Sequence, residues 1–158
     1  MGTIESGGGF VHHTAAPDEG NPAGTHLTNL GVAKVLFEAR NALFLSLDIE
    51  GGIWNQPVTP LIRELLIRYE SEVLPGVPLA CPIVVVSRSR RAFVMEESVT
   101  DISDPGAPRL IATCRGVHVA VASARGVSVD VPDALIHAIE VRQGVAIPRV
   151  DGQEAGPG

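Results

Sequence analysis

The middle of the chain contains one long apolar segment, from about residue 30 to residue 47, whose apolar positions repeat with the period of a helix. The positions at successive intervals of four, three and four residues are Val32, Leu36, Ala39 and Leu43. Thr28 or Asn29 stands at the start of the segment and can accept a hydrogen bond from the amides of the first turn. Because few charged residues interrupt it, the pattern predicts a helix that is covered on most of its sides.

The spacing of apolar residues changes to two after Gly51 and Gly52, where we expect the helix to end, and this spacing is typical of strands. Asp104, Pro105 and Gly106 form a strong turn signal. Residues 132–141 read as a short final helix with a proline near its first turn. Strands are expected at about residues 10–15, 61–73, 83–87, 90–101 and 109–123.

One apolar helix followed by four antiparallel strands predicts an α+β domain in which a curled sheet wraps around a long central helix, the hot-dog fold. A length of 158 residues leaves no room for a second full domain. Glycine is frequent in residues 1–9, and glycine and proline in residues 144–158, so both ends are expected to be flexible. The expected domain is therefore residues 10–143.

Charge and composition exclude several classes of function. Twelve basic and 18 acidic residues give a net charge of −6, which disfavours binding to nucleic acid. No apolar stretch is long enough to cross a membrane, and the first residues do not resemble a secretory signal. Two cysteines are too few for a disulfide scaffold, so we expect a cytoplasmic protein.

The histidines and cysteines form no recognisable metal or nucleophile site. His12 and His13 are adjacent on an expected strand, so their side chains point to opposite faces. His118 is expected to be a core histidine with hydrogen-bond partners. Cys81 precedes a proline in a strand, and Cys114 is expected among small buried groups, where a thiolate is costly. The sequence thus predicts no bound metal and no cofactor.

Two short segments resemble a known family. Residues 24–29 read Gly-Thr-His-Leu-Thr-Asn and residues 36–40 read Leu-Phe-Glu-Ala-Arg. They are similar to the motif of the 4-hydroxybenzoyl-CoA thioesterase-like hot-dog proteins, D-x-x-G-H-V-N-N followed by F-E-E-A-R. His26 and Arg40 are fourteen residues apart, as in that family. The sequence departs from the motif at Pro22, which replaces a loop aspartate, and at Val32, which replaces an aromatic residue.

The resemblance implies hydrolysis of a thioester of coenzyme A or of an acyl-carrier protein, in a homodimer or homotetramer with active sites between subunits. It places the thioester carbonyl at the start of the helix. There the amides of Asn29, Leu30 and Gly31 carry partial positive charge, and the glycine allows a ligand to come close. Asn29 and Thr28 have an equally simple alternative role as helix caps.

Thioester hydrolysis also needs a group that orders or activates water. The polar side chains before the helix that are candidates for this role are Asp18, His26 and Thr28. Asp18 qualifies if its loop folds back toward His26, and otherwise it is a solvated turn residue. His26 has the alternative role of closing a turn.

Three arginines near the expected hairpin gather positive charge in an otherwise acidic chain, namely Arg88, Arg90 and Arg91. Guanidinium groups suit phosphate oxygens, so these residues are candidates to hold the nucleotide phosphates of coenzyme A. The alternative interpretation is that they are ordinary solvated turn residues.

The function that we expect is hydrolysis of an acyl thioester. The alternative is a hot-dog module that binds an acyl or other apolar ligand without turning it over, which the proline at position 22 favours. Acyl dehydratase chemistry on the same fold ranks last, because the start of the helix lacks a convincing pair of histidine and acid.

Overall fold

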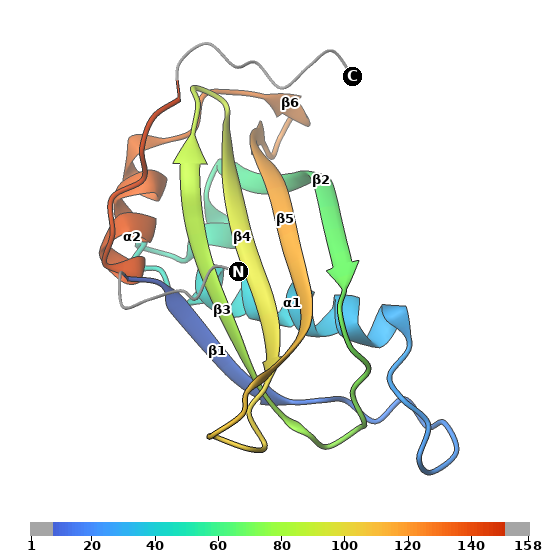
Figure 1. Cartoon of the computed structure of the whole chain (residues 1–158). Coiled ribbons are helices and arrows are strands. Elements are labelled where there is room, and N and C mark those ends of the chain that lie inside the picture. The colour runs from blue at the N-terminus through green and yellow to red at the C-terminus, as the bar shows by residue number, and fades with distance from the viewer. Residues whose placement is uncertain (1–7, 151–158) are drawn as a thin grey trace.

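The computed structural model describes residues 8–150, and its main element is an antiparallel sheet (Figure 1). The strands are β1 (Phe10–Ala15), β2 (Val58–Tyr69), β3 (Pro78–Arg88), β4 (Ala92–Asp101), β5 (Arg109–Ala122) and β6 (Val127–Ser128). They pair in the order β1-β3-β4-β5-β2, and the short β6 also pairs with β5. β1 and β2 are therefore the two edges of an open sheet. The five predicted strands are confirmed, and β6 was not predicted.

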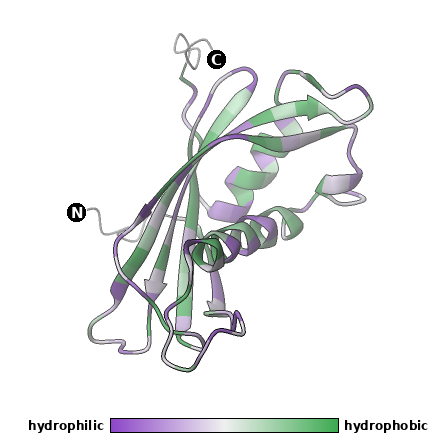
Figure 2. Ribbon diagram, turned by 90° about the vertical axis from the view of Figure 1, so that its right-hand side faces the viewer, coloured by the Kyte–Doolittle hydropathy of each residue, from purple (hydrophilic) through white to green (hydrophobic). Residues whose placement is uncertain are grey.

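Two α-helices accompany the sheet. They are α1 (Asn29–Leu45) and α2 (Asp133–Gln143), and a short 3-10 helix, η1 (Ile53–Asn55), follows α1. α1 contacts β1, β3 and β4 and lies along one face of the sheet, as Figure 2 shows from the side. Both predicted helices are confirmed. The expected long central helix inside a wrapped sheet is not: α1 has 17 residues, about 26 Å, and one of its sides is open.

The ends of α1 follow from local hydrogen bonds. Thr28 is the N-cap residue, and its side chain accepts a hydrogen bond from the Gly31 N–H. The Ser46 N–H donates into the last turn, so the helix ends at Leu45, six residues before the expected stop at Gly51. The predicted core positions of the helix, Val32, Leu36, Ala39 and Leu43, are all buried.

The core lies between α1 and the sheet. The small residues Ala112, Cys114 and Ala120 of β5 are buried, as predicted. Burial raises the pKa of the Cys81 thiol to about 12 and that of the Cys114 thiol to about 11. Both cysteines therefore remain thiols at neutral pH, which agrees with the expectation that neither is a nucleophile.

β2 differs from the expected half-buried strand. A register shift between Ile62 and Glu64 places Ile62 opposite His118 and Leu65 opposite Gly116, so both face the helix side, while Leu61 faces away. A Cβ at Gly116 would lie only 3.2 Å from Leu65 Cδ2, so this glycine makes room for β2. Even so, Leu65 is 41% exposed. β2 thus presents apolar side chains to solvent at an open edge of the sheet.

The segment after α2 packs on β3. Ile147 is buried, the Arg88 N–H donates to the Pro148 carbonyl, and the Val150 N–H donates to the Arg88 carbonyl. The packed part of the chain therefore continues past residue 143, to residue 150. The remaining end segments expected to be flexible, residues 1–7 and 151–158, lie outside the described residues.

One ion pair lies inside the core. Arg40 of α1 donates from Nη1 to Glu97 Oε2 of β4 at 2.9 Å, and both side chains are buried. Burial raises the pKa of Glu97 to about 7, and the charge of Arg40 opposes that rise. The pair joins α1 to the centre of the sheet.

His118 is buried without the hydrogen-bond partners that we expected. Among the described residues, none bonds to its Nδ1 or Nε2. Its ring stacks on Phe93 with the centroids 5.0 Å apart and meets the edge of Phe44. Burial, with a smaller contribution from the charge of Arg40, lowers its pKa from 6.5 to about 4. The folded protein therefore holds His118 neutral.

Replacing this histidine tests the cost of burying it. Unfolding lets His118 take up a proton below pH 6.5, whereas the folded state resists protonation down to about pH 4. Stability is therefore lost as pH falls through this window, by about 2 kcal/mol at pH 5. We expect His118→Leu to exceed the wild type in free energy of unfolding, with a larger difference at pH 5 than at pH 7.5, measured by urea denaturation. A difference that is the same at both pH values would contradict this assignment.

Candidate functional site

Glu19 folds back from its loop onto the start of α1. Its Oε2 accepts a hydrogen bond from the Thr28 N–H at 2.8 Å, and its Oε1 accepts one from the Thr28 hydroxyl at 2.6 Å. The same hydroxyl accepts the Gly31 N–H at 3.2 Å. A chain of hydrogen bonds therefore runs from the carboxylate through Thr28 into the first turn.

Gly31 makes room for this carboxylate. A Cβ at position 31 would lie 2.5 Å from Glu19 Oε1, closer than real Cβ atoms approach. The Gly31 N–H is also occupied by Thr28. Both facts differ from the expectation that Gly31 serves the close approach of a substrate.

The two amides before Gly31 remain open. Among residues 8–150, no group accepts a hydrogen bond from the N–H of Asn29 or of Leu30. Asn29 is exposed, and Leu30 is 81% exposed. Unpaired amides at a helix N-terminus carry the positive end of the helix dipole. This turn therefore offers two hydrogen-bond donors to an oxygen atom of a ligand.

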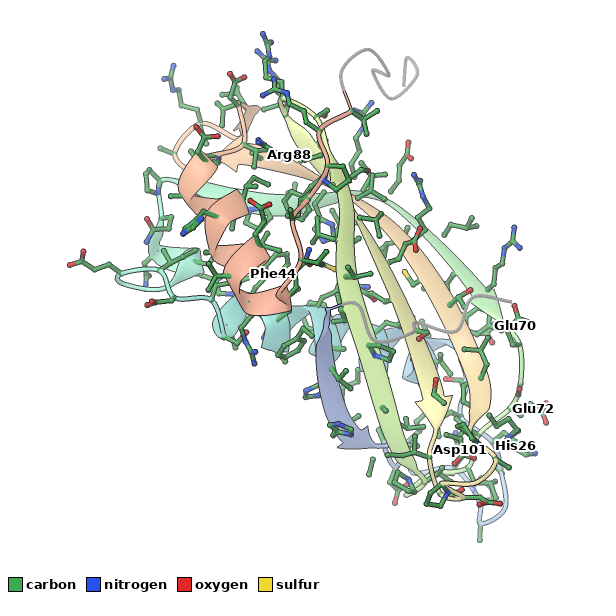
Figure 3. All side chains as sticks on the ribbon, turned by 60° about the vertical axis from the view of Figure 1, so that its left-hand side comes forward. His26, Phe44, Glu70, Glu72, Arg88 and Asp101 are labelled. Carbon is green, nitrogen blue, oxygen red and sulfur yellow. The ribbon has the colours of Figure 1, made fainter. Side chains whose placement is uncertain are left out.

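The end of β2 borders the same turn. The Tyr69 hydroxyl donates to the Asn29 carbonyl at 3.2 Å. His26 lies beside Glu72, with Nε2 and Oε2 3.2 Å apart, and Figure 3 shows both at the end of the molecule that also carries Glu70. The imidazole of His26 thus has a carboxylate partner. Glu19 contacts Thr28 and Glu72 contacts His26, so two acidic side chains lie against the segment that leads into α1.

Asp18 has a different role from its neighbour. Its Oδ1 accepts a hydrogen bond from the Gly20 N–H at 2.8 Å, which closes a local turn. Glu19, one residue further along, is the carboxylate that reaches the helix. Sequence reasoning missed Glu19. The available signal was side-chain length, because the short aspartate suits a turn that contains glycine while the longer glutamate reaches across the loop.

The protonation of Glu19 follows from its two bonds. The Thr28 hydroxyl and, to a smaller extent, the Thr28 N–H lower the pKa of the Glu19 carboxyl below its usual value. Glu19 is therefore ionised at neutral pH. A carboxylate has about four lone-pair positions, of which Thr28 uses two, so Glu19 can still accept hydrogen bonds from water.

The three candidate arginines lie far from this site. The arginines lie at the β3–β4 hairpin, where the first residue of β4, Ala92, is opposite Val119 of β5. Tyr69, at the candidate site, is opposite Ala112 of β5. Seven residues of β5 separate these levels, about 23 Å. Figure 3 accordingly shows Arg88 and His26 at opposite ends. Carboxylates lie 3.8, 3.3 and 3.4 Å from Arg88, Arg90 and Arg91, respectively.

A coenzyme A thioester with its phosphates on these arginines and its thioester group at α1 of the same subunit would therefore have to span most of the sheet. The partners of the arginines are Asp133 for Arg88, and Asp130 for Arg90 and Arg91. The structure does not bring the arginines together with Asn29, His26, Thr28 and Leu30, which do share one end of the molecule.

The structure also contains a small apolar cavity of about 150 Å³. It lies between the start of α2 and the segment that follows α1. Its lining residues are Ile49, Ile53, Gln56, Pro57, Val58, Pro132, Ala134 and Leu135. Its lining includes none of the residues of the amide site and comes only from segments that follow α1 in the chain, so it is not part of that site.

Comparison with known proteins gives a fold but no close relative. No protein-family model matches the sequence, and no curated protein matches it. Solved structures do match, at 12–20% sequence identity for those compared. Among the described residues, no helix is long and apolar enough to cross a membrane.

Three of the similar structures illustrate the match. A hypothetical protein from Staphylococcus aureus, in complex with coenzyme A, is 14% identical with a TM-score of 0.74, and the match covers 99% of this chain and 100% of that one. A 1,4-dihydroxy-2-naphthoyl-CoA thioesterase from Synechocystis is 15% identical, with a TM-score of 0.69 and coverages of 84% and 96%. A mutant 4-hydroxybenzoyl-CoA thioesterase bound to 4-hydroxybenzoyl-CoA is 16% identical, with a TM-score of 0.71 and coverages of 83% and 98%. The chain therefore has a hot-dog thioesterase-like fold, as the sequence resemblance implied.

The tight packing at Gly31 leads to a test of the site geometry. We expect Gly31→Ala to push the Glu19 carboxylate off Thr28, because the new methyl group occupies its place. The pKa of Glu19 then rises toward its usual value, which a carbon-13 NMR titration of the side chain measures. Gly106→Ala is the control, since its Cβ meets nothing closer than 3.4 Å. An unchanged pKa of Glu19 in Gly31→Ala would show that the carboxylate does not lie against this glycine.

Proposed function

We propose that this protein hydrolyses acyl thioesters of coenzyme A or of an acyl-carrier protein at the start of α1. The observation that carries the proposal is that the N–H groups of Asn29 and Leu30, two exposed residues, have no hydrogen-bond acceptor among the described residues. When water attacks a thioester, the carbonyl oxygen gains negative charge. Donors placed in advance at that oxygen stabilise the transition state, and one such donor contributes about 10²–10³-fold to the rate.

The remaining groups of the site have supporting roles. The hydroxyl of Thr28 orients Glu19 and caps Gly31, and His26 with Glu72 forms the rim at which the leaving thiol departs. The reaction uses the thioester as substrate and needs no other cofactor. Similar folds that are named as thioesterases of aromatic acyl-CoA esters support hydrolysis over ligand binding without turnover.

A second copy of the chain is part of the proposal. α1 and β2 each carry exposed apolar side chains, and the outer edge of β2 pairs with no strand among the described residues. We take these side chains together as one candidate interface. Its largest exposed members are Leu30, Phe37, Leu45, Ile62, Leu65 and Tyr69. Faces of this kind mark interaction sites in soluble proteins. We propose that homodimers form here, alone or as halves of a homotetramer, with the catalytic site at the border of the interface.

The open amide of Asn29 can be removed without disturbing the helix. Asn29 is the first helical residue, where proline is favoured, and Thr28 has φ −71° and ψ 165°, the extended conformation that precedes proline. We expect Asn29→Pro to lower kcat on acyl-CoA about 10²–10³-fold, measured as free thiol released. Asn29→Ala, which keeps the N–H, serves as the control and should stay near wild type.

Two outcomes would contradict the proposal. Wild-type protein that releases no thiol from a panel of short, long and aromatic acyl-CoA esters and acyl-carrier thioesters is not a thioesterase of these substrates. If a ligand then copurifies with it, the protein is a binding module. Equal rates for Asn29→Pro and Asn29→Ala would remove the amide from the mechanism.

The assembly has its own test. Wild-type protein should sediment at a mass of at least two copies of 16.6 kDa. We expect Phe37→Glu to shift it to the monomer, because the introduced charge would be buried in the apolar interface. Val11→Glu on the opposite edge strand β1, at a residue of similar exposure, should leave the assembly unchanged. A monomeric wild type, or loss of assembly in Val11→Glu alone, would place the interface elsewhere or exclude it.

A further inference from the structure

We propose that Glu19 is the catalytic base that activates water at this site. The assignment rests on the proposed thioester hydrolysis and names a residue that stands outside the family motif. In that motif the loop carboxylate belongs at position 22, where this chain has a proline. The hydrogen bonds of Glu19 with Thr28, and the space left for it by Gly31, bring a carboxylate back to the start of α1 from three residues earlier in the chain.

The position of Glu19 suits a base. Its Oε2 lies 2.8 Å from the Thr28 nitrogen, and one further residue along the chain is the open amide of Asn29. Adjacent residues are at most about 3.8 Å apart along the backbone, so the carboxylate lies within about 7 Å of the Asn29 amide. We place the attacking water between this carboxylate and a carbonyl carbon held by that amide, which is the geometry that base catalysis through water requires.

Several other polar groups near the first turn of α1 have partners of their own. Asp18 closes the Gly20 turn, and His26 lies against Glu72. The Tyr69 hydroxyl donates to the Asn29 carbonyl. The proton of the Thr28 hydroxyl is directed at Glu19, so Thr28 is a positioning residue that fixes the carboxylate.

The reaction balances with water as the only co-reactant. The water oxygen bonds to the thioester carbon while one water proton moves to the Glu19 carboxylate, and the carbonyl oxygen becomes an oxyanion held by the amides of Asn29 and Leu30. Re-formation of the carbonyl breaks the carbon–sulfur bond. The departing thiolate takes the proton from Glu19, which leaves a carboxylic acid, a thiol and the carboxylate that began the cycle.

Glu19→Gln separates the base from the structural role of this side chain. The glutamine oxygen can still accept the Thr28 N–H, but the amide cannot take up a proton. We expect kcat to fall about 10²–10⁴-fold with KM changed little. Asp18→Asn, at the adjacent carboxylate, should retain wild-type kcat.

Two further measurements exclude a purely structural effect. In the wild type, kcat/KM should fall at acid pH as Glu19 takes up a proton, and this acid limb should be missing from the residual activity of Glu19→Gln. Glu19→Ala leaves space for a small carboxylate, so added formate should restore part of its activity. Glu19→Gln should keep the thermal unfolding midpoint near that of the wild type.

The outcomes distinguish this inference from the proposed function. If wild type and Glu19→Gln release thiol at the same rate, or if Asp18→Asn shows the loss instead, Glu19 is not the base although the protein is a thioesterase. A loss of activity in Glu19→Gln that accompanies unfolding, with no formate rescue of Glu19→Ala, assigns Glu19 to the fold and overturns the inference. If the wild type itself releases no thiol, the proposed function fails and the inference fails with it.

Discussion

The packing of α1 on the sheet is the constraint on which the rest of the structure depends. Its buried positions include Val35, Leu36, Ala39 and Leu43, all almost inaccessible to solvent. Burying one large aliphatic side chain contributes about 1.5–3 kcal/mol, more than a helix cap, which contributes about 1 kcal/mol. The packing of its buried side chains on the core therefore stabilises the helix more than the hydrogen bonds at its ends do. Its first turn is fixed relative to β2 even though two amides there remain unpaired.

The buried ion pair determines how the helix is placed. Removing Arg40 and Glu97 from water costs as much as their attraction returns, so the pair adds little net stability. It does require one rotation and one axial position of α1, because only there does the guanidinium meet Glu97 on β4 at 2.9 Å. The same rotation leaves Phe37 and Leu45 exposed to solvent. The exposed apolar side chains that we assign to the interface with a second copy thus follow from the helix rotation that the buried ion pair requires.

The sequence predicted what depends on periodic patterns. The apolar repeat located α1, one of its two N-cap candidates, Thr28, is the cap, and the alternation located the strands, although it assigned Leu61 of β2 to the wrong face. Features that depend on folding over a distance were not predictable in the same way. The bulge at residue 63 of β2 has no signature in the alternation of its neighbours. The carboxylate partners of the hairpin arginines, Asp130 and Asp133, come about 40 residues later in the chain.

Glu19 illustrates the same limit within the site. The loop that carries it has no repeat, and its path is defined by backbone bonds to distant segments, such as the Ala16 N–H to the Val77 carbonyl and the Leu27 N–H to the Val73 carbonyl. Only this path decides which of two adjacent acids reaches the helix. His118 is a similar case, since its isolation follows from the aromatic rings that pack around it and not from its own neighbours in sequence.

In the first turn of α1, one amide is bound by the helix cap, and two amides have no acceptor among the described residues. Thr28 takes the Gly31 N–H, which satisfies the donor that lies deepest in the turn and fixes the loop before the helix. The amides of Asn29 and Leu30 have no acceptor among the described residues, and in the proposed mechanism an oxygen atom of the substrate takes that place. Because Glu19 is bound to the capping residue itself, the position of the carboxylate is coupled to the position of the amides. In the proposed mechanism, the donors for a developing negative charge and the acceptor for a proton are therefore held in place before the substrate arrives, and this arrangement lowers the cost of reorganisation in the transition state.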